Sequence, residues 1–373
     1  MSQSSSKATE TILEIDLNAL GANFRFLKSK IPSATKFMAV VKAFAYGSDS
    51  QMVAKELESL GVDYFAVAYA YEGKLLREAG VSVPILVLHS LEANFETILE
   101  SCLEPNLYSV KILKDFIAFA EKHQQKNYPI HLKFNSGLNR LGFSEKEMED
   151  LVSLLKKTRS VRVASLFSHL AATEDPSEKD FTLKQIERFE NWAASLSETL
   201  GYQPLKHTVN TSGILNYPQA HFDMVRSGIG LYGFGNEAKY HSALKPIAAL
   251  KTIISQIHEL QKGESLGYNR GFVAEKFTRT ATLPLGHADG IGRIYGHGKG
   301  WVTIHGKKAP ILGIVCMDMI MVDVTEIPCE EGDEVIVFGE THTAEDLASS
   351  AKTISYELIT SISQRVKRVI CRK

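Results

Sequence analysis

The segment FMAVVKAFAYGSDSQMVAKELESLGVDYFAVA, residues 37–68, decides the fold class. It begins and ends with short apolar runs, 37–43 and 63–68, that are typical of buried strands. Between them, residues 51–61 place apolar side chains at helical spacing and end on a glycine. The segment therefore predicts a strand, a helix and a second strand that runs parallel to the first.

The same alternation continues to about residue 232. Six further runs have the composition of strands, and they occupy residues 84–89, 106–110, 130–134, 163–169, 206–210 and 222–228. Helical patterns separate them, for example at 145–157 and 181–201. Eight strands that alternate with helices predict an α/β fold, a (β/α)8 barrel of the TIM type. An open, doubly wound sheet is the alternative, because it alternates strands and helices in the same way.

A different pattern begins after about residue 245. Short β-rich runs follow one another across Gly-rich or charged turns, at residues 248–260, 278–286, 300–306, 309–315, 319–325 and 333–339. This spacing predicts a mainly β domain, followed by helical segments at 344–352 and 355–366. We expect a barrel domain over residues 1–245 and a C-terminal β domain over 246–373. The early strand 12–16 fits either domain.

Composition excludes several classes of protein. The formal net charge of -1 and the absence of a basic block give no sign of a nucleic-acid surface. The first ten residues, MSQSSSKATE, have no apolar core, and no apolar run has membrane-spanning length. We therefore expect a cytoplasmic protein with no membrane partner. The histidines show none of the spacings that are typical of metal-binding motifs. The four cysteines, Cys102, Cys316, Cys329 and Cys371, form no Cys-x-x-Cys pair.

Polar side chains collect where the predicted barrel strands end. Active sites of such barrels lie at the carboxyl ends of the strands, and charged groups there are costly unless they are paired or used. The residues concerned are Lys42, Lys133, Arg140, His169, His207, Asn210 and Arg226. Any one of them fits a surface charge, but seven from five strand ends predict a binding site.

Lys42 is the sharpest of these candidates, because it directly follows the apolar run FMAVV. A lysine that emerges from a buried strand can have a lowered pKa and can form a Schiff base with a carbonyl group. The alternative is a lysine whose stem packs along the strand end while its amine reaches water.

The glycines of RSGIGLYGFG (226–235) match the bare dinucleotide-binding pattern at Gly228, Gly230 and Gly233. No strong helix pattern follows them, and no acidic residue lies about twenty positions further on. Two interpretations remain: a turn whose N–H groups bind a phosphate, and a tight turn after the last barrel strand.

Nine segments, taken in order, resemble the alanine racemase family over nearly the whole chain. They are MAVVKAFAYG (38–47), HLKFNSGLNRLGF (131–143), FSHLAATED (167–175), HTVNTSG (207–213), FDMVRSGIGLYG (222–233), GESLGYNRGF (263–272), ADGIGR (288–293), VCMDMIMVDV (315–324) and TISYELITSISQRVKR (353–368). The resemblance implies a pyridoxal 5'-phosphate (PLP) enzyme that interconverts L- and D-alanine and supplies D-alanine for peptidoglycan.

The resemblance also implies roles for the residues of the barrel. Lys42 would carry PLP covalently and act as the base for D-alanine. Arg226, supported by His207, would donate to the pyridine nitrogen. Arg140 would contact the phenolic oxygen of PLP and the substrate, beside Lys133, which resembles a lysine often found carbamylated. The other cofactor-binding positions would be Tyr46, His169, Asn210, Thr211, Gly228, Ile229 and Tyr356.

Besides Tyr356, three implied site residues lie in the β domain. Tyr268 would be the base for L-alanine, Met317 would offer its backbone N–H to the substrate carboxylate, and Asp318 would orient its neighbours. In the family, this tyrosine reaches the active site of the other subunit, so the resemblance implies a head-to-tail homodimer.

Several positions depart from the family pattern without removing either base. They are Phe44, Ser48, Asn135, Ser136, Phe167 and His287. His287 stands where a tyrosine is usual in a segment expected to line the substrate corridor. A racemase for serine or a basic amino acid therefore stays open, as does a PLP-dependent decarboxylase. A non-catalytic PLP-binding protein would resemble the barrel alone.

Overall fold

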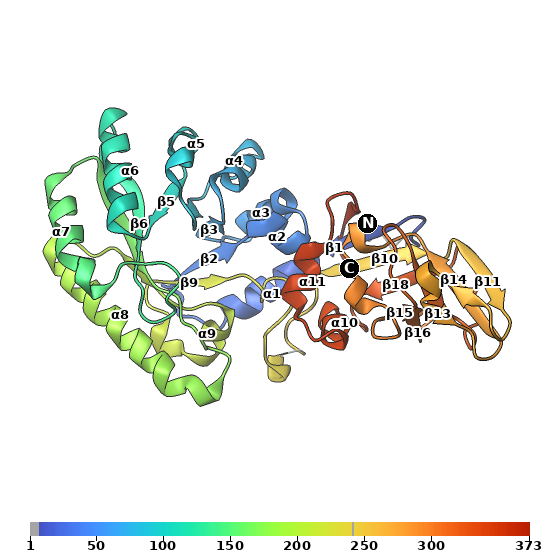
Figure 1. The fold of residues 1–373 in the computed structure, drawn as a ribbon. Helices are drawn as coiled ribbons and strands as arrows, with labels where there is room; N and C mark the ends of the chain where they lie inside the picture. The colour runs from blue at the N-terminus through green and yellow to red at the C-terminus, as the bar shows by residue number, and fades with distance from the viewer. Residues whose placement is uncertain (1–6, 241) are drawn as a thin grey trace.

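The structure is a computed structural model, and it describes residues 7–240 and 242–373. Eight parallel strands form one sheet in the order β8-β7-β6-β5-β4-β3-β2-β9 (Figure 1). The strands are β2 (Lys36–Val40), β3 (Tyr64–Val67), β4 (Ile85–Val87), β5 (Glu104–Leu107), β6 (Tyr128–Lys133), β7 (Val161–Phe167), β8 (Leu205–His207) and β9 (Met224–Ser227).

Two backbone hydrogen bonds bring the outer strands of this sheet together. Asp223 N–H donates to Lys206 O at 3.1 Å, and Arg226 N–H donates to Val209 O at 3.2 Å. The sheet is therefore a nearly closed barrel, which confirms the predicted TIM-type fold and excludes the open sheet. A cluster of apolar side chains packs in its interior, namely Met38, Tyr64, Ala66, Leu86 and Met224.

Helices connect successive strands and cover the barrel. They are α1 (Leu17–Lys28), α3 (Ser50–Ser59), α4 (Ala70–Glu78), α5 (Phe95–Glu100), α6 (Val110–Lys122), α7 (Met148–Lys157), α8 (Lys179–Leu200) and α9 (Thr211–Asn216). In α3, the Asp49 side chain accepts the N–H of Met52 at 2.9 Å and so caps the helix. The same helix buries Val53, Ala54 and Leu57, as its sequence pattern predicts.

The β domain contains a nine-stranded sheet in the order β11-β14-β17-β16-β15-β18-β10-β1-β19. Its strands are β1 (Ile12–Asp16), β10 (Ala248–Ile253), β11 (Gln256–Leu260), β14 (Thr278–Leu283), β15 (Trp301–Ile304), β16 (Lys307–Leu312), β17 (Ile320–Asp323), β18 (Glu334–Phe338) and β19 (Lys367–Cys371). A separate ribbon pairs β12 (Ser265–Leu266) with β13 (Phe272–Val273). β1 thus lies in the β sheet, between β10 and β19.

The end of the chain corrects one expectation. The helical pattern at 355–366 predicts one long helix, but α11 (Ser355–Ser361) is short and β19 follows it. β19 pairs in parallel with β1, a partner more than 350 residues away in the sequence. α11 and α10 (Ala344–Ser350) lie between the barrel and the large sheet (Figure 1).

In residues 7–240 and 242–373, no helix is both long and apolar enough to cross a membrane. Over the same residues, no group of three or more His, Cys, Asp or Glu side chains is arranged to hold a metal ion.

Candidate active site

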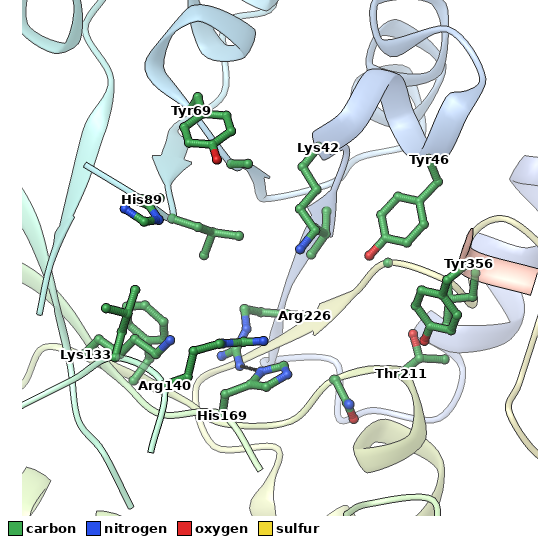
Figure 2. Close-up of a pocket in the computed structure, with 18 residues that line it drawn as sticks. Lys42, Tyr46, Tyr69, His89, Lys133, Arg140, His169, Thr211, Arg226 and Tyr356 are labelled. Atoms are coloured by element: carbon green, nitrogen blue, oxygen red, sulfur yellow. Dashed lines mark hydrogen bonds between the residues drawn. The ribbon is translucent and has the colours of Figure 1, made fainter. Parts of the chain in front are cut away.

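A cavity of about 580 Å³ opens at the carboxyl ends of the barrel strands. Every residue that the sequence assigns to the cofactor, together with Lys133, lines it. They are Lys42, Tyr46, Lys133, Arg140, His169, Asn210, Thr211, Arg226, Gly228, Ile229 and Tyr356. Tyr356 comes from α11, so a helix beyond the barrel strands completes the cavity of its own chain. In Figure 2, the Lys42 amine and the Tyr46 hydroxyl both point into this space.

The cavity is strongly cationic. Four basic side chains face it, Lys42, Lys133, Arg140 and Arg226, and no Asp or Glu is among the described residues that line it. Burial and the nearby Arg140 lower the pKa of Lys42, although Glu72 acts in the opposite direction. Burial and the three neighbouring cations lower the pKa of Lys133 to about 8. Such a cavity suits a ligand that carries several negative charges.

Lys42 begins a backbone turn of unusual conformation, α2 (Lys42–Gly47). The four residues after it, Ala43 to Tyr46, have φ between 52° and 54°, which is the left-handed region. Each such non-glycine residue costs about 1–2 kcal/mol, so tertiary contacts must hold the turn.

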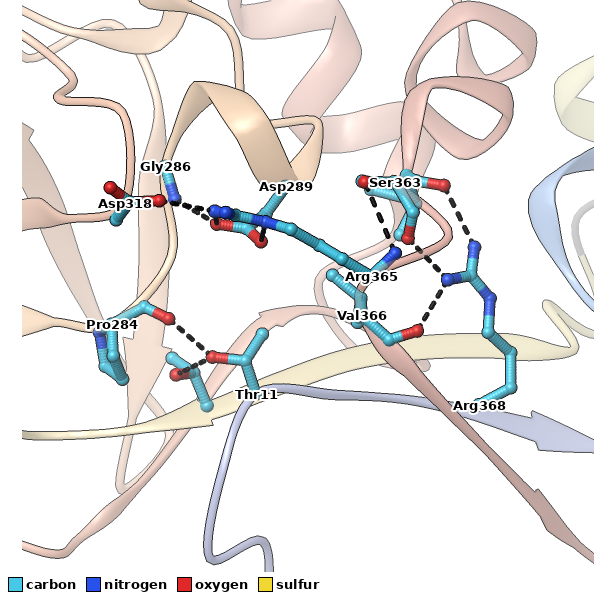
Figure 3. A network of polar contacts seen from close by, with 11 residues as sticks. Thr11, Pro284, Gly286, Asp289, Asp318, Ser363, Arg365, Val366 and Arg368 are labelled. Carbon is cyan, nitrogen blue, oxygen red and sulfur yellow. Dashed lines mark hydrogen bonds and ion pairs between the residues drawn. The ribbon is translucent and has the colours of Figure 1, made fainter.

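Two side chains, one from the barrel and one from the large sheet, form hydrogen bonds with this turn. The Glu72 carboxylate accepts the Ala43 N–H at 2.6 Å. Arg368, on β19, donates to Gly47 O at 2.9 Å and to Ser48 O at 3.2 Å. Figure 3 shows Arg368 also bonded to the segment that precedes β19, through Ser363 and Val366. The lysine is therefore supported by both the barrel and the large sheet.

The glycine-rich turn lies beside α9. A Cβ atom on Gly228 would overlap the Tyr46 hydroxyl, so any other residue there would require the Tyr46 ring to move. The N–H groups of Gly228 and Ile229 have no hydrogen-bond partner within the described part of the chain. Thr211 lines the cavity at the first turn of α9, next to Tyr356 in Figure 2. Free N–H groups and hydroxyls around one small space suit a phosphate.

Asn210 lines the cavity, but its side-chain oxygen is already occupied by hydrogen bonds within the protein. Its side-chain oxygen accepts hydrogen bonds from Gly213 N–H at 2.9 Å and from the Thr173 hydroxyl at 2.8 Å. Asn210 therefore caps α9 and holds the neighbouring Thr211 in position.

Arg226 is buried at the floor of the cavity. Its Nη1 donates to His207 Nδ1 at 2.6 Å, and its Nη2 donates to Ser168 O at 2.8 Å and Thr208 O at 2.9 Å. His169 Nδ1 lies 3.1 Å from the same Nη2. Burial and Arg226 hold the pKa values of His169 and His207 well below the usual histidine range, so both rings are neutral.

Sequence reasoning missed several residues that line the cavity. Tyr69 follows β3 and His89 follows β4, and their rings lie 5.9 Å apart. The available signal was their position at strand ends, since Tyr69 directly follows the predicted strand 63–68 and His89 is the last residue of the predicted strand 84–89. Phe167, noted only as a departure from the family, stacks on His207 with ring centroids 4.8 Å apart.

Three predicted site residues lie away from this cavity, in the β domain. Tyr268, in the loop between β12 and β13, is 71% exposed, and Met317 is 58% exposed. Asp318 accepts a 2.7 Å hydrogen bond from Arg365, which also forms a two-point ion pair with Asp289 (Figure 3). None of the three lines the cavity of its own chain.

Two models of a known protein family match the two halves of the chain. The N-terminal domain of alanine racemase matches residues 15–235, and the C-terminal domain of alanine racemase matches residues 247–370. The chain belongs to the alanine racemase family. The resemblance seen in the nine sequence segments is thereby confirmed.

Individual alanine racemases align with this chain over nearly its full length. The chain is 37% identical to the alanine racemase of Halothermothrix orenii over 366 residues, which is 96% of each protein. The alanine racemase of Clostridium difficile 630 superposes with a TM-score of 0.91 at 32% identity, covering 99% of this chain and 97% of that one. The Bartonella henselae alanine racemase, solved with covalently bound pyridoxal phosphate, has a TM-score of 0.86 at 30% identity, covering 97% and 100%.

Proposed function

We propose that this protein is a PLP-dependent alanine racemase that interconverts L-alanine and D-alanine by proton transfer at Cα. The observation that carries the proposal is a cationic barrel-mouth cavity that contains Lys42, in a chain whose two halves both match alanine racemase. PLP, when bound, withdraws electrons from the substrate and so makes its Cα proton acidic.

The residues of the cavity fit PLP. The free N–H groups of Gly228 and Ile229 and the hydroxyls of Tyr46, Thr211 and Tyr356 suit its phosphate. The lowered pKa of Lys42 favours a neutral amine, which is the form that attacks an aldehyde. Lys42 is therefore assigned to hold the cofactor covalently.

Arg226 is assigned to the pyridine nitrogen, with His207 behind it. A guanidinium only donates hydrogen bonds, so it satisfies a ring nitrogen that carries no proton of its own. An unprotonated ring is a weaker electron sink, which limits side reactions such as transamination. His169 is assigned to pack against the ring, and Asn210 to support the phosphate site through Thr211.

Racemisation needs a base on each face of the substrate Cα. Lys42 is assigned to the D-alanine face and Tyr268 to the L-alanine face. Because Tyr268 is exposed and lies outside its own chain's cavity, it is free to reach the cavity of a second chain. This arrangement supports a head-to-tail homodimer in which each active site is shared.

The remaining assignments concern the substrate carboxylate and the local charge. Arg140 and the backbone N–H of Met317 are assigned to the carboxylate, and Asp318 to orienting that loop through Arg365. Lys133 is assigned a supporting role beside Arg140. Carbamylation would give Lys133 a negative charge and offset the three cations around it.

We also propose the domain boundaries and the cellular role expected from the sequence. Residues 1–245 would form the PLP-binding domain, and residues 246–373 the domain that contributes Tyr268 and Met317 to the partner. The D-alanine product would supply peptidoglycan synthesis in the cytoplasm. Nothing in the composition favours a nucleic-acid or membrane partner.

The testing experiment is a racemisation assay with L-alanine, L-serine and L-lysine, with and without added PLP. Alanine should be racemised fastest, and borohydride reduction should fix PLP on Lys42, as peptide mapping would show. Lys42→Ala is the inactive control. Faster turnover of serine or lysine would point to a different racemase, and release of CO2 from the substrate would point to a decarboxylase. A reduced adduct on Lys133 would overturn the assignment of Lys42.

A further inference from the structure

A line of buried polar side chains crosses the interior of the barrel beneath the cavity. Glu104 on β5 contacts His131 on β6 with Oε2 and Nε2 2.6 Å apart, and His131 Nδ1 lies 2.5 Å from the Ser165 hydroxyl on β7. Ser165 Oγ lies 2.8 Å from Nε2 of His207 on β8. His207 Nδ1 then accepts from Arg226 on β9 at 2.6 Å. Each of five adjacent strands supplies one member.

The chemistry of its two ends gives this line a single direction. Arg226 has only donors, so His207 Nδ1 must accept, and the proton of the neutral ring lies on Nε2. His207 therefore donates to Ser165, whose hydroxyl donates to His131 Nδ1. His131 then carries its proton on Nε2 and donates it to Glu104, whose carboxylate only accepts. The donor Arg226 at one end and the acceptor Glu104 at the other end therefore require the same arrangement of protons along the line.

The middle of the line is closed to solvent. His131, Ser165 and His207 have no exposed surface, so water cannot replace a missing partner without a rearrangement of the barrel interior. Without the Ser165 hydroxyl, the Nε2–H of His207 would be buried without an acceptor. The other proton position would relieve this, but it would then present an N–H to Arg226.

We propose that Glu104, His131 and Ser165 are positioning residues that fix the proton position of His207 and thereby hold Arg226 at the floor of the cofactor site. The role in cofactor binding rests on the proposed function. The hydrogen-bond line itself is a property of the protein alone. Glu104 therefore acts on the cavity from four strands away, through contacts that never reach the ligand.

The direct test is the ¹⁵N NMR signature of the histidine rings in the wild-type protein, recorded before and after PLP is added. His207 should be neutral with its proton on Nε2, and Nε2 of His131 should carry the proton that it donates to Glu104. A proton on Nδ1 of His207, or a doubly protonated His207, would overturn the proposal. This measurement needs no racemase activity, so its result does not depend on whether the proposed function is correct.

Variants then test the coupling along the line. Ser165→Ala should change the His207 signals and weaken PLP affinity about tenfold, the effect expected from one lost hydrogen bond in a buried site. Ser197→Ala is the matched control, because the Ser197 hydroxyl is also buried and has no hydrogen-bond partner among the described residues. Equal effects of the two substitutions would overturn the proposal.

Glu104→Gln keeps the size of the side chain but removes its charge. It should lower PLP affinity in the wild-type background and have no further effect in the Ser165→Ala background, because the line is already broken there. Additive losses in the double variant would show that Glu104 acts by another route and would overturn the proposal. If the wild-type protein neither binds PLP nor racemises alanine, the proposed function fails, and the NMR result still decides whether the line exists.

Discussion

The Glu72 carboxylate accepts the backbone N–H of Ala43 at 2.6 Å, immediately beyond Lys42. Its second oxygen accepts the N–H groups of Ala68 at 2.6 Å and Tyr69 at 3.1 Å. One carboxylate thus joins the left-handed turn of the lysine to the end of the neighbouring strand and to the start of α4.

We expect Glu72→Gln to destabilise the protein, because an amide group cannot accept all three N–H groups. The free energy of unfolding should fall by about 1.5–3 kcal/mol, the usual contribution of a hydrogen bond to a charged group. Denaturant unfolding of the two proteins measures this difference. Glu78→Gln, an exposed position on the same helix, is the control and should change stability by less than about 0.5 kcal/mol. Equal stability of Glu72→Gln and wild type would contradict the role given to Glu72.

The stability of the protein should depend on pH through Lys133. Its pKa is about 8 in the folded protein, against a usual value of 10.5, so the unfolded chain binds more protons between these pH values. Stability contributed by this group therefore rises with pH from about 8 to 10.5. In buffers freed of CO2, Lys133→Met should be more stable than wild type at pH 7, by about 1–3 kcal/mol, and the difference should shrink by pH 10.

Lys157→Met, on the exposed part of α7, is the control for this experiment and should show no such pH-dependent difference. If Lys133→Met were instead less stable than wild type at pH 7, the amine would have a compensating negative partner in the folded protein.

Mixing two inactive variants should restore activity. Lys42→Ala lacks the lysine proposed to hold PLP, and Tyr268→Phe lacks the base proposed on the β domain. If Tyr268 serves the other subunit, a heterodimer contains one intact site and one doubly defective site. Dissociation and re-association of an equal mixture should therefore recover racemase activity above either variant alone. A mixture that remains at the level of the separate variants after re-association would show that the site is not shared.

Tyr268→Phe should affect the two enantiomers differently. A base on one face of Cα removes the proton of only one enantiomer, so exchange of the L-alanine Cα proton in deuterated solvent should fall about 10²–10⁴-fold. Exchange of D-alanine should fall far less, and mass spectrometry of the recovered amino acid measures both. Equal losses would mean that Tyr268 only fills the mouth of the site. No loss for either enantiomer would remove Tyr268 from the mechanism.

The barrel strands were predictable because each is a short apolar run between helical patterns, and all eight are present. The limits of β5 were less clear. The run 106–110 predicts a strand, but β5 begins at Glu104, and Ser109 caps α6 by accepting the Ile112 N–H. Glu104 therefore falls outside the predicted strand, and its contact with His131 depends on how two adjacent strands are aligned.

Other features left no local signal in the sequence. Ala43 and Phe44 have no preference for left-handed backbone, so only their tertiary contacts explain the turn. β19 follows the predicted helical segment 355–366 and is not predicted as a strand, because its pairing with β1 decides its conformation. Motifs identified the cavity because lysine, arginine and histidine are unusual at strand ends. Tyr69 carries no comparable signal, since aromatic side chains at strand ends are common, whereas His89 carried the same signal as the other histidines and was overlooked.

The two side chains that form hydrogen bonds with the turn after Lys42 are synthesised at different times. Glu72 follows Ala43 by 29 residues, whereas Arg368 follows Ser48 by 320. At a synthesis rate of about 5–20 residues per second, Arg368 is added roughly 16–64 s after Gly47 and Ser48, whose carbonyl groups it contacts. The neighbourhood of Lys42 is therefore among the last parts of the described chain to be completed, although its strand is among the first to leave the ribosome.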